Sequence, residues 1–311
     1  MSNPKVVALG GGHGLAATLS ALRKVTSNIT AVVTVADNGG SSGRLRTEFN
    51  SLPPGDLRMA LAALCADDQW GRSWAEIMQY RFTSNGEMNN HALGNLLLTA
   101  LWDRDGDPVA GIDRVGELLK IVGRVLPMAL EPLDIEGEFE NNGVISNIRG
   151  QIQVATATGN IKSLKLIPDN PKATPQVISA ISKADYLTIG PGSWFSSVMP
   201  HFLMKEQAEA ILNSNAQKVI ILNLQEDLIS GEFAGNSASE HLDLILSHIP
   251  SLKINYAIAD ESVAKIGEML SKSVLNMGGE LILGDFAHEK GKNHHDIDKL
   301  ASDRKSTRLN S

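Results

Sequence analysis

Three apolar segments of this chain each run directly into a glycine-rich turn, and this arrangement restricts the fold more than any other feature. The segments and their turns are 5–9 with 10–14, 30–35 with 37–43, and 185–189 with 190–193. Buried parallel strands are continuous apolar runs, and in open parallel sheets ligands bind outside the carboxyl ends of the strands. We therefore expect a Rossmann-like, doubly wound α/β fold with a mainly parallel sheet, whose three turns meet at one edge.

The stretch of about 125–167 has a different sequence pattern, with short alternating apolar segments separated by turns rich in asparagine and glycine. The apolar segments are 135–139, 144–148, 152–155 and 164–167. Such spacing predicts an antiparallel β excursion within one α/β domain spanning 1–301. The last ten residues, 302–311, resemble no folded element, and we expect them to be a disordered or foreign tail.

Composition excludes several classes of protein. The net charge is −7 and aromatic residues make up 5%, which argues against a nucleic-acid-binding surface. No run of 18 apolar residues occurs, so no membrane span is expected. The single cysteine, Cys65, and a start without a signal peptide indicate a cytoplasmic protein.

The first glycine-rich turn differs from the standard nucleotide-binding motifs. Gly10, Gly12 and Gly14 are spaced Gly-x-Gly-x-Gly, and the third glycine of the dinucleotide fingerprint is missing. No Lys-Ser/Thr pair follows, which excludes a Walker P-loop. Phosphate binding by backbone N–H groups remains the expectation, and an NAD-binding oxidoreductase stays open as one alternative.

Several polar residues in and near these turns are compatible with two roles, one in ligand binding and one in the local structure. Asp37 can bind a ribose hydroxyl or form part of a turn, and Ser41 and Ser42 can donate to phosphate or belong to the turn. Asp56 can ligate a metal, although capping the helix that follows is its simpler role. Ser193 lacks the Gly-x-Ser-x-Gly spacing of a nucleophile elbow, so no catalytic residue is assigned.

The turns also match the motifs of a known family. The matching segments are 10–15 (GGGHGL), 35–46 (VADNGGSSGRLR), 52–58 (LPPGDLR), 79–82 (QYRF), 94–98 (GNLLL) and 190–193 (GPGS). Together they resemble the gluconeogenesis factor family of the YvcK type, which is related to 2-phospho-L-lactate transferase (CofD). The resemblance covers roughly residues 5–301.

This resemblance implies a cytoplasmic, homodimeric regulator that binds UDP-sugars such as UDP-N-acetylglucosamine. The family is tied to cell shape, cell-wall precursor supply and gluconeogenic growth, through a regulated partner protein. It implies no required cofactor, although NAD could be a bound ligand. The related transferase branch implies Mg²⁺-dependent transfer of phospholactate, for which Asp37 and Asp56 would hold the metal.

Matched position by position, the resemblance implies a set of ligand-binding residues. They are Gly11, Gly12, His13, Gly14, Asp37, Asn38, Gly39, Ser41, Ser42, Asn95, Gly192 and Ser193. Two positions depart from the family pattern, because His13 stands where threonine is usual and Asn38 stands where a second acid is frequent. Losing that carboxylate removes a hard oxygen ligand for Mg²⁺, which favours the regulator over the transferase.

Overall fold

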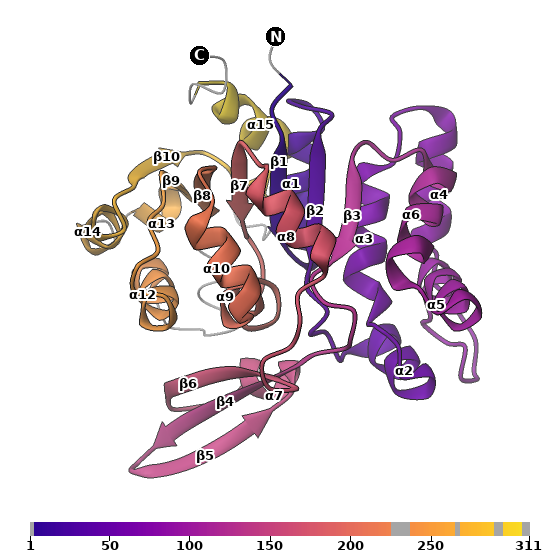
Figure 1. Cartoon of the computed structure of the whole chain (residues 1–311), viewed down its shortest axis with the longest axis horizontal. Helices are drawn as coiled ribbons and strands as arrows, with labels where there is room; N and C mark the ends of the chain where they lie inside the picture. The colour runs from indigo at the N-terminus through magenta and orange to yellow at the C-terminus, as the bar shows by residue number, and fades with distance from the viewer. Residues whose placement is uncertain (1–2, 225–236, 265–267, 289–294, 307–311) are drawn as a thin grey trace.

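The computed structural model describes residues 3–224, 237–264, 268–288 and 295–306. Within these residues a seven-stranded parallel sheet forms the centre of the molecule, in the order β10-β9-β8-β7-β1-β2-β3 (Figure 1). Its strands are β1 Val6–Gly10, β2 Ile29–Val33, β3 Arg124–Pro127, β7 Tyr186–Ile189, β8 Gln217–Ile221, β9 Tyr256–Asp260 and β10 Glu280–Gly284. The predicted doubly wound parallel sheet is confirmed.

The point where the strand order reverses lies at β1. All five residues of β1 are buried, and Ala8 pairs with Ala31 of β2 on one side and Thr188 of β7 on the other. The chain proceeds outward through β2 and β3, then returns past β1 to build β7, β8, β9 and β10. The loops after β1 and β7 therefore diverge and leave a crevice between them, where such folds bind ligands.

Helices cover both faces of the sheet (Figure 1). In the first half of the described chain they are α1 Gly12–Leu22, α2 Gly40–Phe49, α3 Pro54–Leu64, α4 Gln69–Gln79, α5 Leu93–Asp105 and α6 Pro108–Leu119. In the second half they are α8 Pro175–Ser182, the π-helical turn η1 Trp194–Val198, α9 Met199–Leu203, α10 Lys205–Asn213, α12 Ala238–His248, α13 Glu261–Ala264, α14 Glu268–Asn276 and α15 Ile297–Ser306. Among the described ranges, no helix is long and apolar enough to cross a membrane.

A three-stranded antiparallel sheet projects from this body (Figure 1). Its strands are β4 Asp134–Asn141, β5 Val144–Arg149 and β6 Asn160–Ile167, with the short helix α7 Gln151–Ala155 between β5 and β6. Along β4, Ile135 and Phe139 are buried while Glu136 between them pairs with Lys165 at 2.8 Å. This alternation gives the sheet one apolar face toward the body and one charged face.

Two details of the predicted excursion differ in the structure. The segment beginning at Arg124 belongs to the parallel sheet as β3, so the excursion begins only at Asp134. The segment 152–155 lies in helix α7 rather than in a strand. Four residues are too few for their periodicity to separate a helix from a strand, and Gly150, with a φ of +105°, follows β5 just before them.

Two predictions about helix ends are also corrected. Asp56 does not cap α3, because the helix begins at Pro54 with Pro53 as its N-cap residue. Proline suits the first helical position, since its fixed φ is helical and its missing N–H is not needed there, so the N-cap lies three residues earlier than predicted. Helix α15 includes residues 302–306 of the expected tail, while 307–311 lie outside the described residues.

Candidate functional site at the switch point of the sheet

A pocket of about 480 Å³ opens at the carboxyl edge of the sheet between the loops after β1 and β7. Its walls come from the loop after β1, from Asp37 after β2, from the start of α3, from the loop after β7 and from η1. The residues lining it are Gly11, Gly12, His13, Gly14, Ala17, Asp37, Asp56, Met59, Gln151, Pro191, Gly192, Ser193, Trp194, Ser196, Ser197, Asn223 and His295. The pocket thus occupies the place that the fold reserves for ligands.

Glycine is required in the loop after β1 because other chain segments approach it closely. A Cβ atom at Gly14 would lie 2.2 Å from the carbonyl oxygen of Pro191, and one at Gly11 would lie 2.5 Å from Oδ2 of Asp56. Gly12, with a φ of +57°, begins α1. The start of α1 therefore packs closely against the backbone of the loop after β7, and its first residues line the pocket, as in phosphate-binding loops.

Two carboxyl groups, those of Asp37 and Asp56, line the pocket together. Burial raises the pKa of Asp37, and N–H donation from Gly39 at 2.9 Å offsets part of this rise. Burial and, second, the charge of Asp37 raise the pKa of Asp56 from 3.8 to about 7. Two neighbouring carboxyls that resist ionising together are stabilised in their charged form when a cation binds between them, because the cation removes their repulsion.

The loop after β7 is fixed by side chains that the sequence did not mark as site residues. Asn223, which follows β8, accepts a hydrogen bond from the N–H of Gly192 at 2.9 Å and donates to the Gly192 carbonyl at 3.0 Å. The hydroxyl of Ser193 lies 2.6 Å from that of Ser196, which in turn accepts from Nε2 of Gln151 at 2.9 Å. This wall of the pocket is polar and uncharged.

The structure brings together seven of the twelve predicted ligand residues, and Asp56 with them. The seven are Gly11, Gly12, His13, Gly14, Asp37, Gly192 and Ser193. The other five, Asn38, Gly39, Ser41, Ser42 and Asn95, are not part of the pocket lining. Asn38 and Gly39 precede α2, and the buried hydroxyl of Ser42 accepts the N–H of Gly55 at 3.0 Å.

Ser41 and Asn95 belong to a buried hydrogen-bond network behind the pocket. The hydroxyl of Ser41 lies 3.0 Å from Nδ1 of His91 and accepts from Nδ2 of Asn95 at 3.0 Å. Oδ1 of Asn95 accepts from Nε of Arg58 at 2.9 Å, and Arg58 is only 3% exposed. These contacts join α2, α3 and α5, so both residues hold α2 and α5 against α3, the helix that carries Asp56 and Met59 of the pocket wall.

Sequence reasoning missed several lining residues, among them Gln151, Trp194, Asn223 and His295. Asn223 could have been found, because it follows the apolar strand 217–221 just as Asp37 follows β2. Gln151 enters from the β4–β6 excursion and His295 from the polar stretch near the end of the chain. No local signal connects either of them to the glycine-rich turns.

The chemistry of the pocket follows from its lining. Among the described lining residues there is no lysine or arginine, so an anionic group would be held by backbone N–H groups, hydroxyls and histidines. No group of three or more His, Cys, Asp or Glu side chains able to hold a metal occurs in the described ranges. Mg²⁺ commonly takes only one or two carboxylates plus water and substrate phosphates, so Asp37 and Asp56 fit such an ion.

With this geometry in place, comparison with known proteins defines the class. The family model of 2-phospho-L-lactate transferase CofD matches residues 6–300, and the chain belongs to this family. A UPF0052 family protein from Bacillus halodurans, known from its crystal structure, has a TM-score of 0.84 at 34% identity, covering 97% of this chain and 99% of that one.

Curated relatives place the chain more narrowly within the family. A protein of Mycobacterium tuberculosis named "Putative gluconeogenesis factor" is 44% identical over 304 residues, covering 96% of this chain and 88% of the relative. A Listeria innocua protein named "Gluconeogenesis factor" is 35% identical over 312 residues, covering 96% and 94%. The resemblance inferred from the glycine-rich motifs is confirmed.

Proposed function

We propose that this protein is a regulator that binds a nucleotide sugar of the UDP-N-acetylglucosamine type without turning it over. The observation that carries the proposal is the composition of the pocket at the β1/β7 switch point. One wall offers the backbone N–H groups at the start of α1, which suit a diphosphate. The wall after β7 offers the hydroxyls of Ser193 and Ser196, neutral donors and acceptors that suit sugar hydroxyl and amide groups.

The proposed role follows the relatives' name, gluconeogenesis factor. A protein that senses the level of a cell-wall precursor can link that level to carbon flux, and cell shape would then depend on it. In this role ligand binding changes the interaction with a regulated partner protein. The pocket needs no nucleophile for this task.

Titration calorimetry with UDP-N-acetylglucosamine, with and without Mg²⁺, tests the proposal. We expect micromolar binding that is indifferent to Mg²⁺, with the ligand recovered intact by chromatography afterwards. No heat of binding and no thermal shift at millimolar ligand would contradict it.

The pairing of Asp37 with Asp56 favours a second candidate, a Mg²⁺-dependent phosphoryl-group transferase. A bound Mg²⁺ would neutralise the charge of a transferred phosphoryl group. The raised pKa values show that the two carboxyls resist ionising together, which is a typical property of acidic metal sites without their ion. In this candidate the two side chains hold the ion, and the N–H groups of the loop after β1 orient the phosphate.

The variant Asp56→Asn separates the two candidates. For the transferase, this change should abolish Mg²⁺ binding in an isothermal titration with Mg²⁺ alone. For the regulator, it should leave binding of UDP-N-acetylglucosamine measured in EDTA within a few-fold of the wild type. Slow consumption of the ligand by the wild type in Mg²⁺ would give the transferase first place.

A further inference from the structure

The pocket receives one wall residue from the polar stretch that follows the last strand. His295 is only 9% exposed and lines the pocket together with residues from the loops of the sheet. It forms an isolated antiparallel bridge with Ala287, just after β10. The chain thus returns to the site after the parallel sheet is complete.

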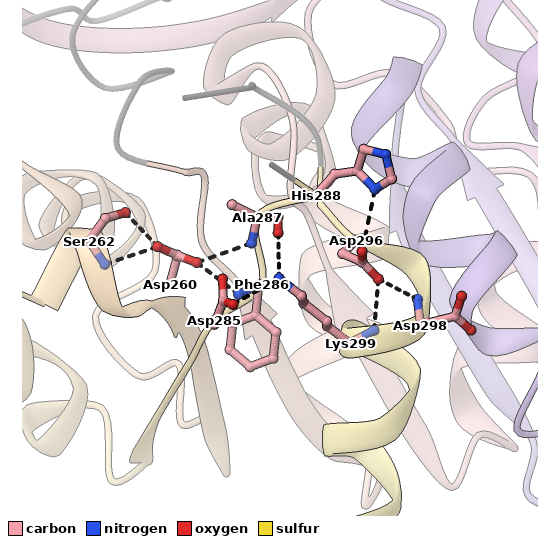
Figure 2. A network of polar contacts seen from close by, with 9 residues as sticks. All are labelled: Asp260, Ser262, Asp285, Phe286, Ala287, His288, Asp296, Asp298 and Lys299. Atoms are coloured by element: carbon pink, nitrogen blue, oxygen red, sulfur yellow. Dashed lines mark hydrogen bonds and ion pairs between the residues drawn. The ribbon is translucent and has the colours of Figure 1, made fainter. Parts of the chain in front are cut away.

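A network of polar contacts fixes this return, as Figure 2 shows. The carboxylate of Asp260, at the end of β9, accepts hydrogen bonds from the N–H groups of Phe286 at 2.8 Å and Ala287 at 3.2 Å. The N–H of Asp296 donates to the Phe286 carbonyl at 2.7 Å. His295 is therefore held at two points, through its bridge with Ala287 and through Asp296, the next residue in the chain.

Helix α15, which follows His295 in the chain, anchors the segment that carries this residue. The side chain of Asp296 accepts the N–H groups of Asp298 and Lys299 at 2.9 Å each, which starts the helix (Figure 2). Nζ of Lys299 donates to Asp285 at 2.8 Å, and Asp298 pairs with Lys24 beyond α1. Leu300 packs with Ala21 of α1 in a common apolar cluster. The ordered network makes His295 a fixed part of the wall.

The charges of the pocket lining indicate a role for the imidazole of His295. Two carboxyls, Asp37 and Asp56, line the pocket, and no lysine or arginine is among its described lining residues. In the described lining, the side chains able to carry positive charge are His13 and His295. Two carboxyls repel an anionic ligand when they are ionised. A charge-assisted hydrogen bond from a histidine offsets this repulsion, because it is about twice as strong as a neutral hydrogen bond.

We propose that His295 is a ligand-binding residue that donates a hydrogen bond to the anionic diphosphate portion of the bound nucleotide. This inference rests on the proposed nucleotide-sugar site and adds a specific contact to it. The segment around β10 and α15 then serves the site directly, by presenting the imidazole.

The test compares His295→Ala, His295→Gln and the wild type in titrations with UDP-N-acetylglucosamine, with inorganic pyrophosphate and with uridine. We expect His295→Ala to weaken binding of the first two about 10-fold or more, with uridine unchanged, since uridine has no phosphate. Glutamine keeps an N–H donor of similar reach, so His295→Gln should recover most of the affinity. His248→Ala is the matched control, because His248 is a half-buried histidine on α12 whose ring contacts the Leu244 carbonyl.

The outcomes separate this inference from the proposed function. If the wild type binds pyrophosphate but not UDP-N-acetylglucosamine, the proposed function fails and the pyrophosphate data alone decide on His295. Wild-type affinity in His295→Ala with an unchanged melting temperature overturns the inference and leaves the proposed function standing. An equal loss for uridine and pyrophosphate also overturns it, because it shows a general change in pocket shape. Binding of neither phosphate ligand by the wild type overturns both.

Discussion

Asn223 binds the backbone of Gly192 from both sides, accepting its N–H at 2.9 Å and donating to its carbonyl at 3.0 Å. The side chain thus acts as a short β-bridge between the loops after β8 and β7. Gly192 has a φ of +143°, in which a side chain would be strained, and its carbonyl and N–H both point at one partner. This amide, together with the Ser193–Ser196–Gln151 hydrogen bonds, fixes the pocket wall that contains Ser193.

The first prediction concerns Asn223. Asn223→Ala removes both hydrogen bonds and should weaken ligand binding about 10-fold while lowering the free energy of unfolding by about 1–3 kcal/mol. Asn255→Ala is the control, because Oδ1 of Asn255 accepts the Lys218 N–H at 2.9 Å at the opposite end of β8. Calorimetry and urea denaturation should show both variants destabilised but only Asn223→Ala impaired in binding. Equal affinities would show that the loop needs no such support.

The second prediction concerns the contact between the loops after β1 and β7. Gly14→Ala places a methyl group 2.2 Å from the Pro191 carbonyl oxygen, so one loop must move. We expect a loss of at least about 2 kcal/mol in the free energy of unfolding, as for other overpacked sites, together with loss of ligand binding. Gly86→Ala should change neither, because a Cβ atom at Gly86 would have no other atom within 4 Å and the φ there is not positive. A Gly14→Ala protein with normal melting would contradict the close approach.

The third prediction follows from the raised pKa of Asp56. Between its ordinary pKa of 3.8 and its folded pKa of about 7, the folded protein binds more protons at this carboxyl than the unfolded chain does. The free energy of unfolding should therefore fall as pH rises through this window. Asp56→Asn cannot ionise, so it should be more stable than the wild type at pH 8 by up to about 4 kcal/mol and similar to it at pH 4.

Denaturation in EDTA across pH 4–8 measures this difference. Asp67→Asn is a suitable control, because the Asp67 side chain is 86% exposed and should leave the pH profile of the wild type unaltered. Parallel profiles for wild type and Asp56→Asn would refute the shift.

The fourth prediction separates the network behind the pocket from the pocket itself. Asn95→Leu leaves Nε of Arg58 without its partner and removes one of the hydrogen bonds of the Ser41 hydroxyl, which keeps its contact with His91. An unpaired buried polar group costs about 1–3 kcal/mol. We expect a drop of about 2–4 kcal/mol in the free energy of unfolding, with ligand affinity within a few-fold of normal at temperatures where the variant is folded. A large loss of affinity in a stable variant would instead support Asn95 as a ligand residue.

The parallel sheet and one half of the site could be predicted from the sequence, because each strand and its turn are contiguous in the chain. A buried strand such as β1 needs an apolar run, and the turn after it needs glycine. The strand and the loop at its end can therefore be recognised together in one short stretch of sequence. The family motifs added Asp37 and Ser193 in the same way.

The remaining site residues depend on contacts that no local pattern encodes. Gln151 and His295 reach the pocket only because a small sheet and a terminal helix dock on the body. Ser41 illustrates a related ambiguity, since a hydroxyl in a glycine-rich turn has the same local sequence whether it faces a ligand or contacts His91 and Asn95, as it does here. Tertiary packing selects between these uses.

The β4–β6 sheet is inserted in the crossover that leads from β3 at one edge of the main sheet back to β7 at its centre. Within the described pocket lining, this insertion contributes Gln151. The hairpin between β4 and β5 can therefore change in length or sequence without disturbing the loops after β1 and β7. Selectivity for the neutral part of a ligand can therefore change through this insertion, while the loops after β1 and β7 keep their packing.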